Sequence, residues 1–235
     1  MAIKPRNNES FYREVDEELR RDQARTLWER YGKLAIAGVV LLLAAIAGAI
    51  YWNNQRQVKA GAQGEKLMAA FDDISGANKA AAGGKLDELA RSDAPGYRAA
   101  ALLTKADLAI EANNLDGAAA LFKQVSEDQS LDETYRNLAL VRRTHVELDK
   151  MQPQAVIDRL KPLAVSGNPW FGSAGEMVAI SYLKLNKPQD AARIFAAMAK
   201  DKQVPASVRS RAVQMAGSLG VDAVEEPAAA SQEGK

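Results

Sequence analysis

The pattern of apolar and polar residues separates one long apolar run from a series of short amphipathic stretches. The run extends from Leu34 to Trp52 and contains no charged side chain. A helix rises about 1.5 Å per residue, so the run would span roughly 28 Å, the thickness of a bilayer's hydrocarbon core. Leu42 lies near its middle, and Trp52 stands where aromatic side chains meet the membrane interface. The pattern predicts a transmembrane helix over 34–52.

A buried core helix or a cleaved signal peptide could also produce such an apolar run. Core helices seldom extend this far without a polar face. Small residues at Ala45, Ala47 and Ala49 resemble a cleavage site, but 33 residues precede the run, whereas a signal peptide begins with a short basic region. An uncleaved signal anchor is the better interpretation.

The positive charges that flank the run predict its orientation. Five basic residues precede it within twenty positions and three follow it: Arg20, Arg21, Arg25, Arg30 and Lys33 against Arg56, Lys59 and Lys66. The excess places the N-terminus in the cytoplasm. The C-terminal part would then lie in the periplasm of a bacterial cell, with the run in the inner membrane.

The two ends of the chain differ from its centre. Residues 1–33 predict a charged cytoplasmic segment with a helix over about 11–30, which is either simply solvated or a docking element. Residues 221–235 are rich in Ala, Glu and Ser, and we expect a disordered tail.

Residues 53–220 predict helices only. They show no sustained alternation of apolar and polar positions, and Gly, Pro and Asn recur at the spacing of helical hairpins. Breakers are expected at Gly76, Gly83-Gly84, Pro95-Gly96, Asn113-Asn114, Pro153, Gly167-Asn168-Pro169, Asn186-Lys187-Pro188 and Pro205. The segments 67–74 and 79–90 would form a degenerate first hairpin, and 205–219 a closing helix.

An internal repeat organises this region. The segments NNLDGAAALFKQV and NKPQDAARIFAAM superimpose, with MQPQAVIDRLKPL between them. We expect the alanines Ala118, Ala155 and Ala191 where the two helices of a unit cross closely. We expect the larger Phe122 and Phe195 to fill the contact with the next unit. Intervals of 37 and 36 residues approach the 34 of tetratricopeptide repeats. The middle unit carries Arg142 and Arg143 where small residues are expected. If the loop between the first and second helix of this unit (the A–B loop) were longer by one or two residues, its register would match that of the other units. The fold class is all-α: one N-terminal transmembrane helix followed by a tetratricopeptide-repeat-like α-solenoid, with a generic helical bundle as the alternative.

In such an array the first helix of each hairpin lines a concave groove that holds partner segments. The register places six residues in this candidate partner groove: Leu103, Asp107, Glu111, Glu176, Ile180 and Lys184. The same positions could simply be solvated. Trp170 and Phe171, at a repeat boundary, are either a partner anchor or, as we favour, inter-repeat core.

The composition of the chain excludes several kinds of chemical site. The net charge is +1, and the chain has one His and no Cys. Disulfides, thiolate metal sites and cysteine nucleophiles are therefore excluded, and no basic face indicates nucleic acid. His145 and Glu147 match the H-x-E pattern of zinc deaminases, but the cysteines of that site are missing. We predict no catalytic residue, cofactor, metal or small-molecule substrate, and therefore no enzyme.

The chain resembles the ancillary subunits of the SecYEG translocon. The resemblance rests on Tyr31-Gly32-Lys33 and Tyr51-Trp52-Asn53 at the ends of the run, the N-terminal FYREVDEELRRDQ, and the last repeat over Gly167–Met198. It implies a single-span inner-membrane protein with a periplasmic repeat domain. It also implies partners: the translocon and a membrane-anchored periplasmic chaperone of the prolyl-isomerase type.

Our hypothesis for function is a non-enzymatic, membrane-anchored adaptor that assists the handover of exported proteins. The alternative is a helical-repeat scaffold for a different envelope complex, in secretion, division or outer-membrane assembly, because one repeat fold serves many partners.

Overall fold

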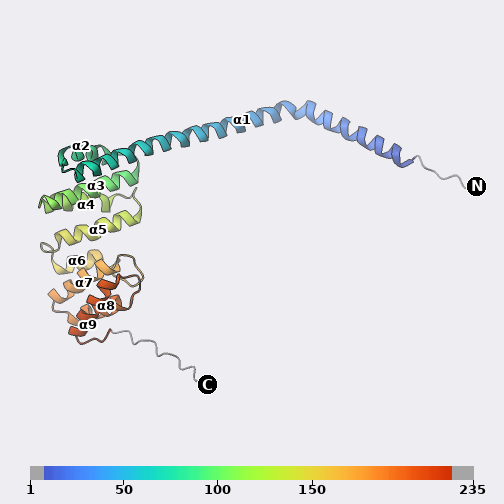
Figure 1. Cartoon of the computed structure of the whole chain (residues 1–235). Coiled ribbons are helices and arrows are strands. Elements are labelled where there is room, and N and C mark those ends of the chain that lie inside the picture. The colour runs from blue at the N-terminus through green and yellow to red at the C-terminus, as the bar shows by residue number, and fades with distance from the viewer. Residues whose placement is uncertain (1–7, 224–235) are drawn as a thin grey trace, which may run out of the picture. The chain divides into compact units, whose positions relative to one another are not determined.

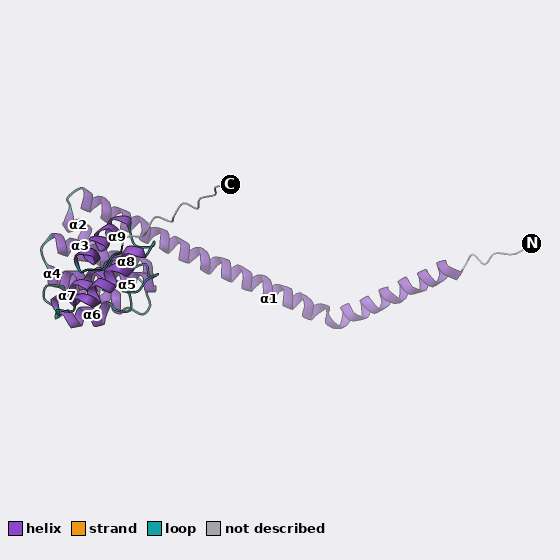
Figure 2. Cartoon of the chain, turned by 90° about the horizontal axis from the view of Figure 1, so that it is seen from below, coloured by secondary structure: helices purple, strands orange, loops and turns teal. Residues whose placement is uncertain are grey.

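The computed structural model of the chain describes the backbone of residues 8–223 and the side chains of residues 25, 28–34 and 36–223. All regular elements within this range are helices (Figure 2). Most of the expected C-terminal tail, residues 224–235, lies outside it, as do residues 1–7. Compactness divides the chain into two units that meet within one helix, at Ala62 and Gln63.

The first unit consists of the long helix α1, Asn8–Ser75, which continues into the second unit. The charged segment, the apolar run and the first repeat helix, expected as separate elements, are parts of this one helix. The sequence between them contains only isolated glycines and no proline, so nothing ends the helix before Gly76. Leu34, Leu42 and Trp52 are 68%, 60% and 64% exposed. The guanidinium carbon of Arg56 lies 5.5 Å from the centre of the Trp52 ring, one turn after the run ends.

The second unit is a stack of antiparallel helices that follow one another in chain order (Figure 1). After the end of α1 come α2 (Lys79–Leu89), α3 (Pro95–Glu111), α4 (Leu115–Glu127), α5 (Glu133–Glu147), α6 (Pro153–Leu160), α7 (Phe171–Lys184), α8 (Pro188–Lys200) and α9 (Ala206–Ser218). The hairpins α3–α4, α5–α6 and α7–α8 are the three repeats. The Gly83-Gly84 pair, expected as a breaker, lies inside α2.

Asparagines shape the turns of the two outer repeats. Asn113 and Asn186 each lie two residues before a second helix, with φ of 56° and 55°. Asn tolerates this left-handed conformation better than most residues, and it ends the first helix of the hairpin. The next residue in the first repeat, Asn114, caps α4 by accepting a hydrogen bond from the Gly117 N–H at 2.9 Å. The three-residue connections 112–114 and 185–187 follow from this chemistry.

Four apolar clusters lie along the stack, and each joins neighbouring helices only. At one end of the stack, Ala70, Leu86 and Ala101 form a buried cluster between α1, α2 and α3. At the other end, a cluster that includes Phe171, Phe195 and Ala212 joins α7, α8 and α9. Two further clusters centre on Phe122 and on Leu160. This nearest-neighbour arrangement is typical of solenoids, in which each hairpin buries its apolar face against the next.

The helix starts correct one part of the expected register. Ala118 and Ala191 are buried at the fourth position of α4 and α8, and Phe122 and Phe195 at the eighth. Ala155, by contrast, is exposed. The fourth and eighth positions of α6 are Val156 and Leu160, which are buried, because α6 begins at Pro153.

The middle repeat is irregular in the way the sequence predicted. The α5–α6 connection, residues 148–152, has five residues where the outer repeats have three. An A–B loop two residues longer is therefore confirmed. Met151 stands where the outer repeats have the left-handed Asn, so this turn follows a longer path.

Candidate partner-binding groove

The first helices of the three repeats, α3, α5 and α7, enclose a hollow of about 320 Å³. We call it the groove hollow. It is lined by Ile110 from α3, by Val141, Arg142, His145 and Val146 from α5, and by Ser173, Glu176 and Met177 from α7. Its lining is mostly apolar at the base, where Val141 and Met177 are buried, while His145 and Ser173 are exposed.

Of the six residues expected in the groove, the structure places only Glu176 in this lining. Asp107 lies next to it, because its carboxylate accepts hydrogen bonds from Arg142, one of them at 3.1 Å. Leu103 instead packs against the core around Phe122. Glu111 pairs with Lys79 of α2 at 2.7 Å. Ile180 is half-buried and Lys184 is exposed near the end of α7.

Two acids at the groove each connect a repeat to the element that follows it, the middle repeat for Asp107 and the closing helix α9 for Glu176. Glu176 accepts two hydrogen bonds from Arg211 of α9, at 2.7 and 2.9 Å, just as Asp107 joins α3 to Arg142 of α5. The pKa of Arg211 is raised, first by its hydrogen bond to Glu176 and then by the charge of that carboxylate. The rim of the groove hollow is thus polar but locally neutral.

The two arginines that disturbed the repeat pattern in α5 have separate roles. Arg142 lines the groove hollow, and its guanidinium carbon lies 5.0 Å from the centre of the Phe122 ring, within cation–π range. Arg143 points to the other side, where its side chain is only 18% exposed. It pairs with Glu127 of α4 at 3.5 Å and with Glu147 of its own helix at 3.2 Å.

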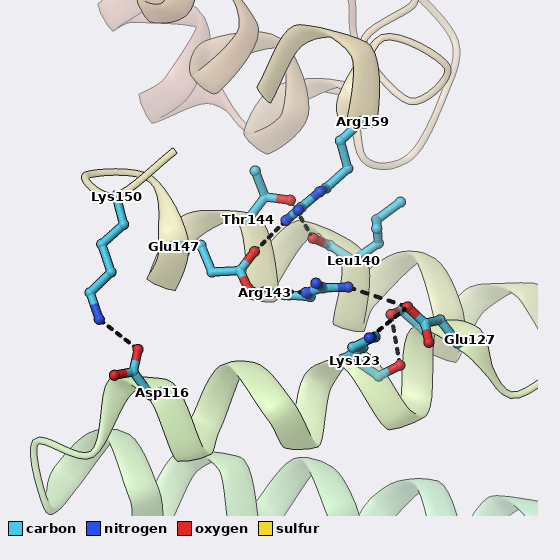
Figure 3. A network of polar contacts seen from close by, with 10 residues as sticks. Asp116, Lys123, Glu127, Leu140, Arg143, Thr144, Glu147, Lys150 and Arg159 are labelled. Atoms are coloured by element: carbon cyan, nitrogen blue, oxygen red, sulfur yellow. Dashed lines mark hydrogen bonds and ion pairs between the residues drawn. The ribbon is translucent and has the colours of Figure 1, made fainter. Parts of the chain in front are cut away.

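Glu147 is the centre of a polar network at the α4–α5–α6 seam (Figure 3). Arg159 of α6 donates a hydrogen bond to its carboxylate, and Lys150 reaches Asp116 nearby. Burial alone would raise the pKa of Glu147, but hydrogen bonds from Arg159 and Arg143 outweigh burial and hold that pKa below its ordinary value. These contacts join α6, the shortest helix of the stack, to the helices before it.

Sequence reasoning missed the contribution of α5 to the groove. Val141, Arg142, His145 and Val146 all line the hollow, but the uncertain register of the middle repeat left α5 without assigned groove positions. The out-of-place pair Arg142-Arg143 was the available signal, because charged residues inside a repeat pattern need partners. His145 is exposed on α5, on the face that lines the groove hollow. Phe171 is buried in the cluster of α7, α8 and α9, and Trp170 packs half-buried against the separate cluster around Leu160, so neither side chain is a fully exposed anchor.

Two further features define what the chain can do. Within the described residues, no group of three or more His, Cys, Asp or Glu side chains could hold a metal ion. The part of α1 over Trp28–Ser75 contains a window of mean hydropathy 2.5 with none of it buried, which is long and apolar enough to cross a membrane. A signal sequence near an N-terminus has the same properties.

Stacked helical hairpins whose first helices enclose a groove define an all-helical repeat protein that binds other proteins. A family model described as a tetratricopeptide repeat-like domain matches residues 25–217, which is most of the chain. The chain therefore belongs to the tetratricopeptide repeat-like domain family. Searches of curated proteins and of solved structures found no significant match.

Proposed function

We propose that this protein is a membrane-anchored adaptor of the bacterial Sec translocon. The apolar part of α1 holds it in the inner membrane, with the N-terminus in the cytoplasm and the repeats in the periplasm. The repeats bind a membrane-anchored periplasmic chaperone of the prolyl-isomerase type and assist the handover of exported proteins. It has no catalytic role of its own. The observation that carries the proposal is the apolar groove hollow across all three repeats, in a chain that also contains an apolar helix of membrane-spanning length.

The chemistry of the hollow favours an apolar anchor from a protein partner. Apolar side chains line its base, and ion pairs already neutralise Arg142 and Glu176 at its rim. A bulky aliphatic or aromatic side chain would bury apolar area there without leaving a charge unpaired. His145 and Ser173, which are exposed, would hydrogen-bond the partner's main chain around that anchor.

Anchoring makes weak contacts sufficient. A protein confined to the membrane surface meets other membrane proteins at an effective concentration far above its average in the cell. A groove that holds one anchor side chain can therefore select its partner without a large interface. The translocon itself is supported by the residues at the ends of the apolar run and in the last repeat that resemble the ancillary subunits.

The test is a pull-down of the tagged full-length protein from native inner membranes in a mild detergent, analysed by mass spectrometry. Wild type is compared with Ser173→Arg, which fills the groove hollow, and with Gln154→Arg, a matched change on the exposed side of α6. We expect wild type and Gln154→Arg to retain translocon subunits and a periplasmic chaperone, and Ser173→Arg to lose the chaperone. Enrichment of another envelope complex, without the translocon, would transfer the function to the scaffold alternative.

The topology has its own test. Protease added to spheroplasts should degrade the repeats, while a tag before Phe11 stays protected. Protection of the repeats would contradict the periplasmic placement.

A further inference from the structure

A second hollow, of about 270 Å³, lies between the start of α5 and the loop before α7. We call it the Trp170 pocket. It is lined by Glu133, Thr134 and Asn137 from α5 and by Asn168, Pro169 and Trp170 from the loop. Unlike the groove hollow, it combines an aromatic residue with a carboxylate, a hydroxyl and two amides.

The Trp170 pocket and the groove hollow follow one another along the same two elements. Asn137 of the pocket and Val141 of the groove hollow are four residues apart, so they are neighbours on one face of α5. Trp170 of the pocket and Ser173 of the groove hollow are three residues apart at the start of α7. A segment bound along the groove would therefore pass both hollows.

Glu133 is the charged residue among those that line the pocket. Its carboxylate accepts a hydrogen bond from Nδ2 of Asn137 at 3.3 Å. Within the described part of the chain, Glu133 has no ion-pair partner. The amide oxygen of Asn137 can accept a further hydrogen bond next to this carboxylate. The pocket thus offers a negative charge together with neutral acceptors.

Charged residues next to the lining balance one another. Asp132 caps α5 by accepting a main-chain hydrogen bond at 2.8 Å, which also offsets the positive end of the helix dipole. Hydrogen bonds within this cap, and then the charge of Arg136, lower the pKa of Asp132. Beside the loop, main-chain hydrogen bonds and then the charge of Arg209 lower the pKa of Asp201. Glu133 is therefore the charge that a ligand in the pocket would meet.

A carboxylate beside an aromatic residue suits a guanidinium group. The planar head of an arginine stacks on an aromatic ring while its N–H groups donate to a carboxylate. Its five donors can also reach the oxygens of Thr134 and Asn137. A lysine ammonium would match the charge but not this planar geometry.

We propose that the Trp170 pocket binds an arginine of the partner segment whose apolar anchor fills the groove hollow. The inference rests on the proposed function, because it takes the groove hollow as the site of that anchor. Thr134 of the pocket and Arg142 of the groove hollow are eight residues apart on α5, which is roughly 12 Å of helix. An extended chain covers about 3.4 Å per residue, so the arginine and the apolar anchor are about three to five positions apart in the partner.

A random dodecapeptide library displayed on phage, selected on the full-length protein in detergent, tests this pattern. On wild type we expect peptides in which an arginine stands about three to five positions from a bulky apolar residue. On Glu133→Gln we expect the apolar residue to remain and the arginine to lose its enrichment. Glu65→Gln, a matched change at an exposed position of α1, should select the same peptides as wild type.

The most enriched peptide is then synthesised with arginine, lysine or citrulline at the basic position. Citrulline has nearly the shape of arginine but carries no charge. On wild type, fluorescence anisotropy should show an affinity about fivefold lower for citrulline than for arginine, with lysine between them. On Glu133→Gln this difference should shrink below about twofold, because the carboxylate that distinguishes the two is gone.

The outcomes separate this inference from the proposed function. Enrichment of the apolar residue without arginine would overturn the Trp170 pocket as a site and leave the groove hollow standing. Equal affinities of the arginine and citrulline peptides, or a preference that Glu133→Gln leaves unchanged, would overturn it as well. If no peptide is enriched on wild type, or if Ser173→Arg still selects the apolar residue, the groove hollow itself fails as the anchor site.

Discussion

Gly175 in α7 offers a sharp test of the packing between repeats. A Cβ at this position would lie 2.9 Å from Met198 Sδ and 3.0 Å from Cδ2 and Cε2 of Phe171, well inside ordinary contact distance. Met198 belongs to α8, and both neighbours are buried. Only glycine lets α7 and α8 approach this closely.

The expected effect of Gly175→Ala is the difference between two opposing terms. Alanine in a helix is worth about 0.4–1 kcal/mol over glycine, because glycine loses more backbone freedom on folding. Overpacking a closed core costs about 1–3 kcal/mol. The thioether of Met198 can move, but the Phe171 ring is 2% exposed and fixed by its neighbours. Because that ring cannot move away, the overpacking cost should lie in the upper part of its range, and we expect Gly175→Ala to destabilise the repeats by about 1–2 kcal/mol net, a loss of about 2–8 °C in Tm.

Gly84→Ala in α2 is the matched control. A Cβ there would meet nothing within 4 Å, so the same substitution should stabilise by about 0.4–1 kcal/mol. Thermal unfolding of the two full-length variants in detergent, followed by far-UV circular dichroism, measures both. Opposite signs support the close α7–α8 crossing. A Gly175→Ala variant as stable as wild type would refute it.

Two further changes examine the repeat register and the polar network. Ala118→Leu, at a fully buried position, should lower the free energy of unfolding by about 1–3 kcal/mol. Ala155→Leu, at an exposed position, should change it by no more than about 0.5 kcal/mol. Equal losses for the two variants in urea denaturation would contradict this register and mean that Ala155 lies at the helix crossing. Glu147→Gln should destabilise the protein by about 1 kcal/mol at neutral pH, because Arg143 and Arg159 lose a charged acceptor. Glu127→Gln is the control: its side chain is 60% exposed, so the stability should change little. Since the folded pKa of Glu147 is lowered, its contribution is present above the ordinary value of 4.5 and disappears as pH falls through the lower folded pKa. The gap between wild type and Glu147→Gln should therefore close in acid, and a gap that widened there would contradict this sign.

The network around Glu147 also explains how a stack tolerates an irregular repeat. The α5–α6 hairpin lacks the Asn turn, and its second helix has 8 residues where the counterparts have 13. An ion pair from Arg143 to Glu127 joins α5 to α4, and charge-assisted hydrogen bonds from Arg143 and Arg159 to Glu147 join α5 to α6. The departures of this repeat from the pattern are thus connected: a longer loop, a shorter helix and a polar seam.

The sequence alone determined the features that depend on local chemistry. Some features depend only on the backbone and side chains of a few neighbouring residues: an uncharged run, asparagines in turns and prolines near helix starts. The sequence could therefore predict the all-helical class, the apolar helix and the turns at Asn113 and Asn186. The same local logic would have placed Val156 rather than Ala155 at the crossing, had Pro153 been used as the helix start.

Only the tertiary structure decided which of these helices meet and what their polar residues do. Asp107 and Arg142 are 35 residues apart in the chain, as are Glu176 and Arg211. The first pair forms only when the middle repeat stacks on the first, and the second only when α9 stacks on the last repeat. The groove hollow depends on residues from three helices at once. Such features arise from distances between segments that no local pattern encodes, which is why the candidate groove was only partly anticipated.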